Sequence, residues 1–225
     1  MTYTARAALT ALAFTTLLAG CQNNPKGYAE DGDKYYAYYH YDEAAASYAK
    51  SLEIMPGQPQ VRAQYGRSLL KSGHPKEAAQ QLAISILEDP NDDALDDYCE
   101  ALAQSGQFDE LHRVLRTYAG DRGNARDYLR YGKYALQMGD ADAAKTALIT
   151  SARLDGGKTP DAHIALYDYY MAVNNPAPDK AMAVRHLRMA YAIAPKNPQV
   201  MSRVAKSGEV PGPTFGLRPS VEGEQ

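Results

Sequence analysis

Residues 61–90 read VRAQYGRSLLKSGHPKEAAQQLAISILEDP, two stretches of periodic apolar residues separated by a turn at Gly73. Apolar residues at helical spacing on both sides of a glycine indicate two amphipathic helices joined by a short turn. Pro59, a favoured first residue of a helix, and Pro90 bound the pair. This stretch therefore predicts a helix-turn-helix hairpin. A single hairpin cannot bury its apolar face alone, so further copies are expected along the chain.

The same features recur at a spacing of 33 residues. Three kinds of position recur at this spacing: a tyrosine, the small residue after it, and a turn glycine. These are Tyr65, Tyr98 and Tyr131; Gly66, Cys99 and Gly132; and Gly73, Gly106 and Gly139. Candidate helix starts keep the same spacing at Pro59, at the N-caps Asn91 and Asn124, and at Thr159 before Pro160. A repeat of this length predicts an all-α solenoid of stacked hairpins.

The pattern resembles the tetratricopeptide repeat, whose signature has a large then a small residue on the first helix and alanine on the second. Leu111 departs from it, because the signature has alanine there. The resemblance implies about five helix-turn-helix repeats over residues 34–207, the first one degenerate, with a capping helix from about Pro198 to Ser207. It assigns helix packing to Tyr65, Gly66, Ala78, Tyr98, Cys99, Tyr131, Gly132 and Ala144.

A tyrosine-rich stretch, KYYAYYHYDEAAASY at residues 34–48, is either an aromatic ligand surface or repeat core. The repeat pattern places Tyr41, Ala44 and Tyr48 on the second helix of a first repeat. Its first helix would be poorly formed, since Gly27 and Gly32 interrupt it and no glycine marks the turn. Most of these tyrosines are therefore predicted to pack in the repeat core at helical spacing, with their hydroxyl groups reaching solvent at its edge. The tyrosines assigned to the first helix are Tyr35, Tyr36, Tyr38 and Tyr39.

The first residues have the pattern of a targeting segment. Arg6 precedes an apolar run from Ala7 to Leu18, which is too short to span a bilayer as a helix. The sequence Leu-Ala-Gly-Cys that follows resembles the lipobox of bacterial lipoproteins. The resemblance implies a signal peptide at residues 1–20 and a covalent lipid on Cys21, followed by a linker over residues 21–33. Because Gln22 rather than aspartate follows the cysteine, it also implies the periplasmic face of the outer membrane.

Composition excludes several classes of protein. The formal charge of −3 offers no basic excess for nucleic acid. Two cysteines, Cys21 and Cys99, cannot form a disulfide scaffold. The five histidines stand singly, without a metal-binding motif, and no phosphate loop or nucleophile elbow occurs. The sequence predicts a protein that is not an enzyme and has no cofactor, metal or small-molecule substrate.

The candidate partner site is the concave face formed by the first helices of the repeats. An alternation of acidic and basic residues there favours a polar or charged peptide. The acidic run at residues 88–97 has a second interpretation, because acids in the first turn of a helix offset its dipole. The repeat register assigns eight residues to this groove: Tyr36, Arg67, Lys71, Asp93, Asp96, Glu100, Arg126 and Lys133.

Residues 208–225 are rich in proline and glycine and are predicted to be extended or disordered. Phe215-Gly216-Leu217 within them is either passive, docked on a partner, or folded back into the groove. Sequence patterns do not choose among these.

The layout of signal, lipobox and repeats resembles that of pilotins and of assembly lipoproteins for pili and outer-membrane proteins. We therefore expect a membrane-anchored scaffold that binds other proteins, in pilus, secretion or outer-membrane assembly. The alternative is an adaptor that regulates a peptidoglycan-modifying enzyme.

Overall fold

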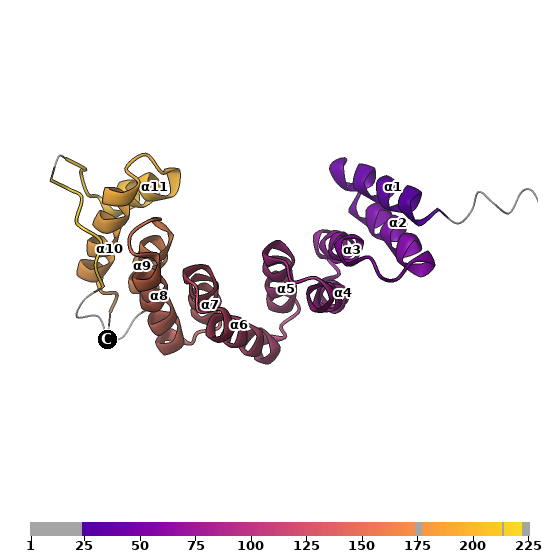
Figure 1. The fold of residues 1–225 in the computed structure, drawn as a ribbon. Coiled ribbons are helices and arrows are strands. Elements are labelled where there is room, and N and C mark those ends of the chain that lie inside the picture. The colour runs from indigo at the N-terminus through magenta and orange to yellow at the C-terminus, as the bar shows by residue number, and fades with distance from the viewer. Residues whose placement is uncertain (1–23, 174–176, 213, 222–225) are drawn as a thin grey trace, which may run out of the picture. The chain divides into compact units, whose positions relative to one another are not determined.

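The computed structural model describes residues 24–173, 177–212 and 214–221. Within these ranges every regular element is an α-helix (Figure 1). The prediction of an all-α fold with five helical pairs and a C-terminal helix is confirmed for the described residues. In chain order the helices are α1 (Pro25–Ala37), α2 (Tyr41–Ile54), α3 (Pro59–Lys71), α4 (Pro75–Glu88), α5 (Asp92–Gln104), α6 (Phe108–Arg122), α7 (Ala125–Gln137), α8 (Ala141–Asp155), α9 (Asp161–Ala172), α10 (Lys180–Ile193) and α11 (Pro198–Ser207).

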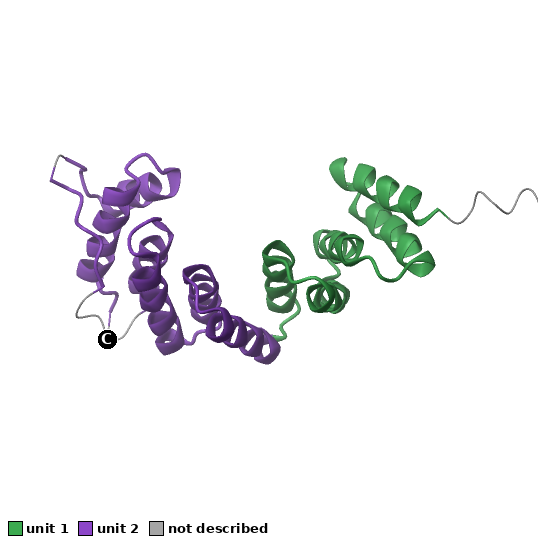
Figure 2. Cartoon of the chain, viewed as in Figure 1, with its two compact units in different colours: residues 1–107 green, residues 108–225 purple. Residues whose placement is uncertain are grey.

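The chain forms two compact units, residues 1–107 and residues 108–225 (Figure 2). The first contains α1 to α5 and the second α6 to α11, so the boundary falls at the turn between α5 and α6. Within each unit, helices adjacent in sequence pack against each other. In addition α3 contacts α5, and α7 contacts α9, which places the first helices of successive repeats side by side.

Helix starts follow local capping chemistry. The side chain of Asn91 accepts hydrogen bonds from the backbone N–H groups of Asp93 and Ala94, and that of Asn124 accepts one from Asp127. Pro59 is the first residue of α3, where its missing N–H has no helical partner to lose. The starts predicted at these three residues are confirmed.

A small residue lies where the two helices of a repeat touch. A Cβ on Gly66 would lie 2.6 Å from Cγ of Leu82, and one on Gly132 would lie 2.6 Å from Cγ of Leu148. Both glycines therefore allow a close approach that any side chain would block.

The first repeat has the same close approach at Gly32, where a Cβ would lie 2.6 Å from Cε1 of Tyr48. The prediction that residues 21–33 form a linker and that Gly32 interrupts the helix is wrong for residues 25–33, which belong to α1. Gly32 precedes Gly66 by 34 residues, one more than the spacing of the later repeats. Asp31 precedes Gly32, whereas the later repeats have a tyrosine before the small residue. The repeat pattern is therefore not recognisable at Gly32 from sequence.

A buried serine ties the second helix of several repeats to the start of the first. The hydroxyl of Ser51 donates to the carbonyl of Pro25 (2.7 Å), that of Ser85 to Pro59 (2.8 Å), and that of Ser151 to Ala125 (2.7 Å). In each case the partners are 26 residues apart, and all three serines are buried. Each bond satisfies a buried hydroxyl inside one hairpin.

The turn of the first repeat uses a tyrosine where the others use glycine. Gly73, Gly106 and Gly139 have φ values of 85°, 73° and 82°, and Tyr39 has a φ of 64°. The prediction that most first-helix tyrosines pack in the core is wrong: Tyr35 is 42% exposed, and Tyr38 and Tyr39 are 75% and 77% exposed. Because α1 ends at Ala37, Tyr38 and Tyr39 lie in the turn.

Replacing Tyr39 with glycine should stabilise the protein. A left-handed backbone costs a non-glycine residue about 1–2 kcal/mol. The gain is reduced by the greater chain entropy of glycine and by loss of the Tyr39–Tyr41 edge contact. We expect a net increase of about 0.5 kcal/mol in the free energy of unfolding, measured by urea titration. The control is Tyr38→Gly. Tyr38 has a φ of −94°, so this change should not stabilise the protein. Equal effects of the two changes would contradict a strained turn.

The segment after α11 packs against the second unit. Phe215 is 7% exposed and joins an apolar cluster formed by α9, α10 and α11. Residues 209–212 and 214–221 contain no helix, as predicted for an extended tail. A disordered tail was the other prediction, and it does not fit residues 214–217, because a buried phenylalanine anchors them.

The predicted signal peptide at residues 1–20 and Cys21 lie outside the described residues. Among the residues that are described, no helix combines the length and apolar character needed to cross a bilayer.

Candidate functional site

In the first unit, an ion pair joins the first helices of two repeats. Nε of Arg67 on α3 donates to the Asp97 carboxylate on α5 at 2.6 Å, and Nη1 of Arg67 donates to Gln64 at 3.1 Å. Burial raises the pKa of Asp97 above its ordinary value, although the hydrogen bond from Arg67 opposes the shift. Both side chains are about three-quarters buried, which fixes the guanidinium on the face shared by α3 and α5.

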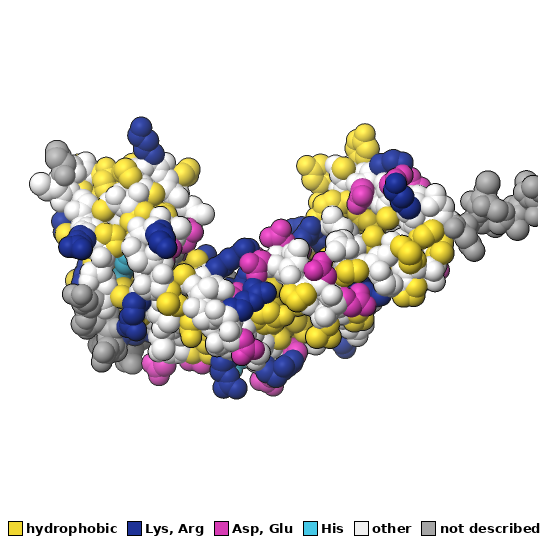
Figure 3. Space-filling view, viewed as in Figure 1, with side chains coloured by type: hydrophobic (Ala, Val, Ile, Leu, Met, Phe, Trp, Pro, Cys, Tyr) yellow, Lys and Arg dark blue, Asp and Glu magenta, His cyan; other side chains and the backbone are white. Residues whose placement is uncertain are grey.

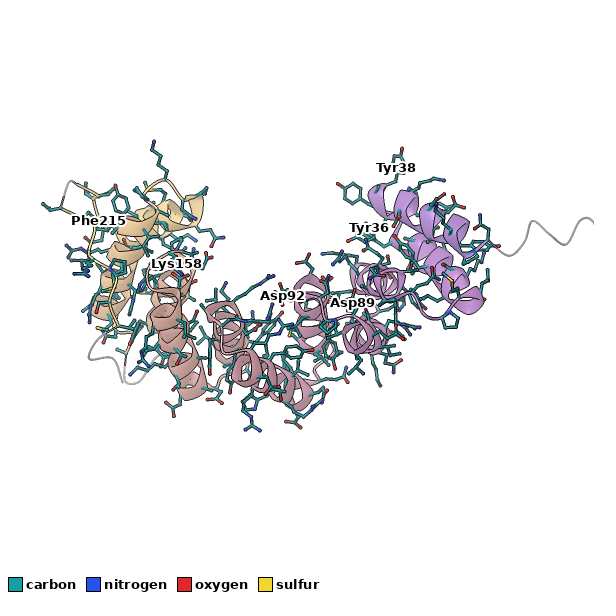
Figure 4. All side chains as sticks on the ribbon, in the orientation of Figure 1. Tyr36, Tyr38, Asp89, Asp92, Lys158 and Phe215 are labelled. Atoms are coloured by element: carbon teal, nitrogen blue, oxygen red, sulfur yellow. The ribbon has the colours of Figure 1, made fainter. Side chains whose placement is uncertain are left out.

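Tyr36 extends this face onto α1 (Figure 4). It is half-buried, and its ring packs edge-on against Tyr41 with centroids 5.2 Å apart. Burial raises the pKa of Tyr36, and the charge of Arg67 opposes this shift. Tyr36 and Arg67, two of the residues assigned to the groove from sequence, lie on the first helices of successive repeats.

Three of the remaining groove candidates of the first unit, Lys71, Asp93 and Asp96, lie near the ion pair. Lys71 lowers the pKa of Asp97 and Asp96 raises it, so both charges act on this carboxylate. A shallow pocket of about 170 Å³ lies between α3, α4 and α5 and is lined by Gln60, Arg67 and Asp93, among others. Acidic and basic side chains lie next to one another over these helices (Figure 3). Glu100 is exposed on α5 and accepts a hydrogen bond from Gln104.

Sequence reasoning missed Asp97, although it named Asp96 beside it. The repeat register assigns faces from the position of the small residue, and Asp97 lies two residues before Cys99. Its side chain reaches Arg67 because α5 packs beside α3. The sequence did contain one indication of this pair, namely an acidic residue 30 residues after Arg67, which is three residues less than the repeat spacing.

In the second unit, Arg126 and Lys133 are exposed on α7. This unit has its own ion pair between two helices, in which Nε of Arg203 on the C-terminal helix α11 donates to Asp168 on α9 at 2.8 Å. Neither of these residues was assigned from sequence.

The residues assigned to repeat packing occupy helix contacts. The three alanine or cysteine positions Ala78, Cys99 and Ala144 are fully buried. Tyr65 and Tyr98 are half-buried, and so is Tyr131, whose hydroxyl lies 2.7 Å from Nε2 of His112. Burial raises the pKa of Tyr131. These side chains contribute to the packing between helices.

Two of the histidines that stand singly in the sequence meet in the structure. Nδ1 of His163 on α9 and Nδ1 of His186 on α10 are 3.0 Å apart, both rings are buried, and Tyr170 stacks on His186. Among the residues that the structure describes, no group of three or more His, Cys, Asp or Glu side chains is arranged to hold a metal ion.

A sequence profile described as "Tetratricopeptide repeat" matches residues 35–97, the stretch from α1 to α5. No curated protein matches the sequence. Solved structures of similar fold cover most of the chain. The chain has the tetratricopeptide-repeat fold.

Three of these structures illustrate the likeness. PilW, titled a widely conserved type IV pilus biogenesis factor, is 17% identical with a TM-score of 0.60, over 83% of this chain and 86% of its own. PilF of Pseudomonas aeruginosa is 20% identical with a TM-score of 0.56, over 81% and 83%. YrrB, titled a tetratricopeptide-repeat protein with an unusual peptide-binding site, is 17% identical with a TM-score of 0.55, over 86% and 98%. At this identity the likeness shows the fold alone.

Tetratricopeptide-repeat proteins are typically scaffolds that bind other proteins rather than enzymes. The charged, partly recessed face of α3 and α5 fits this role, because it offers a peptide both a cation and acids at fixed positions.

Proposed function

We propose that this protein is a scaffold of the bacterial envelope, held at the periplasmic face of the outer membrane by a lipid on Cys21. Its groove binds a protein that takes part in assembling a pilus or secretion machine. The observation that carries the binding role is the arrangement of Tyr36, Arg67 and Asp97 on the first helices of the first unit. The fold shared with PilW and PilF supports the choice of machine.

The chemistry of the groove favours an extended peptide that carries charges of both signs. Arg67 is held by Asp97 and Gln64, so a ligand finds it already oriented and loses little entropy in ordering it. Lys71 and Asp96 are exposed beside it. A peptide with an acid and a base at the matching spacing is attracted by both charges, whereas a purely apolar segment gains nothing from them.

Crosslinking in living cells, followed by pull-down, tests the groove. A charge-swapped variant, Lys71→Glu with Asp96→Lys, reverses the groove and leaves net charge unchanged. Its matched control is Lys76→Glu with Glu77→Lys on α4, where both side chains are exposed. We expect a pilus or secretion component to be captured by wild type and control but lost from the groove variant. Capture of a cell-wall hydrolase or synthase instead would overturn the assembly role, and equal capture by both variants would remove the site from the groove.

Substitution of Cys21 tests the anchor. Because several acyl chains hold a lipoprotein far more firmly than one, Cys21→Ser should move the protein from the membrane fraction to the soluble fraction. The helical signal in circular dichroism should be unchanged, since Cys21 precedes α1. A variant that remains with membranes through high-salt washing would show that a lipid on this residue is not the anchor.

A further inference from the structure

The tail of the chain lies in a site that recognises backbone as well as side chain. The guanidinium of Arg188 on α10 donates from Nε to the carbonyl of Phe215 at 2.7 Å and from Nη2 to the carbonyl of Thr214 at 3.3 Å. In return, the N–H of Leu217 donates to the carbonyl of Arg188 at 3.1 Å. Three hydrogen bonds thus hold the main chain of an extended segment, which is how a peptide is bound with little dependence on its sequence.

Two side-chain requirements add specificity. The ring of Phe215 is buried among α9, α10 and α11 and meets Tyr191 edge-on, with centroids 5.1 Å apart. Gly216 follows it directly against α10, where a Cβ would lie 3.1 Å from Cβ of Ala192. The site therefore accepts a phenylalanine followed by a glycine, and a larger residue after the phenylalanine would crowd the helix.

The residues before the anchor have few contacts. Glu209, Val210 and Thr214 are exposed, Val210 at 86%, and Gly208 in the left-handed conformation ends α11 just before them. Further along, Pro219 lies against Gly157, and Val221 packs against the apolar cluster of α7, α8 and α9. Residues 214–217 are themselves held by one ring and three hydrogen bonds, so this stretch can detach while α10 stays folded. Figure 4 shows Phe215 in this position beside α10.

We propose that the face formed by α10 and α11 is a second peptide-binding site, which takes an extended partner segment carrying Phe-Gly. The chain's own residues 214–217 fill it until such a segment displaces them. The site is distinct from the groove of the first unit and does not depend on the envelope role. Its ligand is defined by an aromatic anchor, a glycine after it, and free backbone carbonyls for Arg188.

A fluorescent peptide with the sequence EVPGPTFGLRPSV, residues 209–221, tests the proposal on the full-length chain. In wild type the tethered tail competes at a high effective concentration, so the peptide should bind about tenfold more tightly to the Phe215→Ala variant, whose own anchor is missing. The control Val210→Ala keeps the anchor and should match wild type. Peptides with alanine for the phenylalanine, or valine for the glycine, should bind Phe215→Ala about tenfold more weakly than the parent peptide.

Three outcomes would overturn the proposal: a folded Phe215→Ala variant that does not bind the parent peptide, equal binding to all three proteins, or wild-type dimers that require Phe215. The last would assign the site to the tail of a second copy. Hydrogen exchange of wild type gives a test that does not depend on the variant. The Leu217 amide should exchange about tenfold faster than the core amides of α10, because the tail opens locally. Equal rates would make the tail a permanent part of the fold.

Discussion

Gly132→Leu should lower the free energy of unfolding by about 3 kcal/mol, because overpacking in a tight contact forces side chains and backbone apart. A Cβ at this position lies 2.6 Å from both Cγ and Cδ2 of Leu148 and 3.1 Å from the backbone nitrogen of Leu148. The side chain of Leu148 can turn away, but its backbone cannot move without shifting α8. Urea unfolding followed by circular dichroism measures the loss, which should appear also as a melting temperature lower by about 10 °C.

The matched control is Gly120→Ala in α6. Gly120 is exposed in a helix, and no atom lies within 4 Å of the Cβ that alanine would add. This change should therefore stabilise by about 1 kcal/mol through helix propensity. Opposite signs for two helical glycines would establish that the contact, and not the residue type, decides the outcome. An unchanged melting temperature for Gly132→Leu would refute the packing of α7 on α8 described above.

Asp127→Ala should destabilise the second unit by about 3–5 kcal/mol, since it leaves the charge of Arg130 buried without this carboxylate. Asp127 is 2% exposed and Arg130 is 7% exposed, and the guanidinium of Arg130 donates to the carboxylate one helical turn before it. The carboxylate also accepts a hydrogen bond from Asn124 at 2.7 Å and lies 3.7 Å from Arg122 on α6. Loss of Asp127 therefore disturbs the start of α7 as well as its core contact.

Comparing a single variant with a double variant separates the effect of the buried charge from that of the helix cap. Asp127→Leu combined with Arg130→Met removes both charges and keeps the volume, so it should recover most of the stability that the single Asp127→Leu change loses. The measurement is again urea unfolding. If the double variant is as unstable as the single one, the cost comes from the cap with Asn124 rather than from the buried charge.

The fold could be predicted largely from the positions of small residues. Gly66 and Gly132 are two repeat spacings apart because the same close approach of two helices recurs at both, and the position between them holds the buried Cys99. Where the neighbouring residues depart from the pattern, the prediction fails. Gly32 makes the same approach to Tyr48, but it was interpreted as a break in the helix. Tyr39 takes a backbone conformation that favours glycine, so the first turn carried no recognisable signal.

The partner of a side chain was harder to predict than the helix face on which the side chain lies. The register assigned Tyr36 and Arg67 to one face of the first helices, α1 and α3. The register could not identify the partner of Arg67, because the pairing depends on the distance between α3 and α5 and on the rotamer of the arginine side chain. The docked tail was unpredictable for a related reason. Its sequence is poor in apolar residues, and its single anchor, Phe215, needs a cluster assembled from three helices.

The serine bonds from Ser51, Ser85 and Ser151 each close within one hairpin, and in the pairs α1–α2, α3–α4, α7–α8 and α9–α10 the two helices pack more extensively with each other than with the neighbouring helix pair. Under mechanical tension, these four hairpins should therefore separate from their neighbours before any of them opens. A protein tethered at one end and pulled through a bound partner would then lengthen in hairpin-sized steps. Such a chain acts as an extensible link whose individual segments keep their folded form.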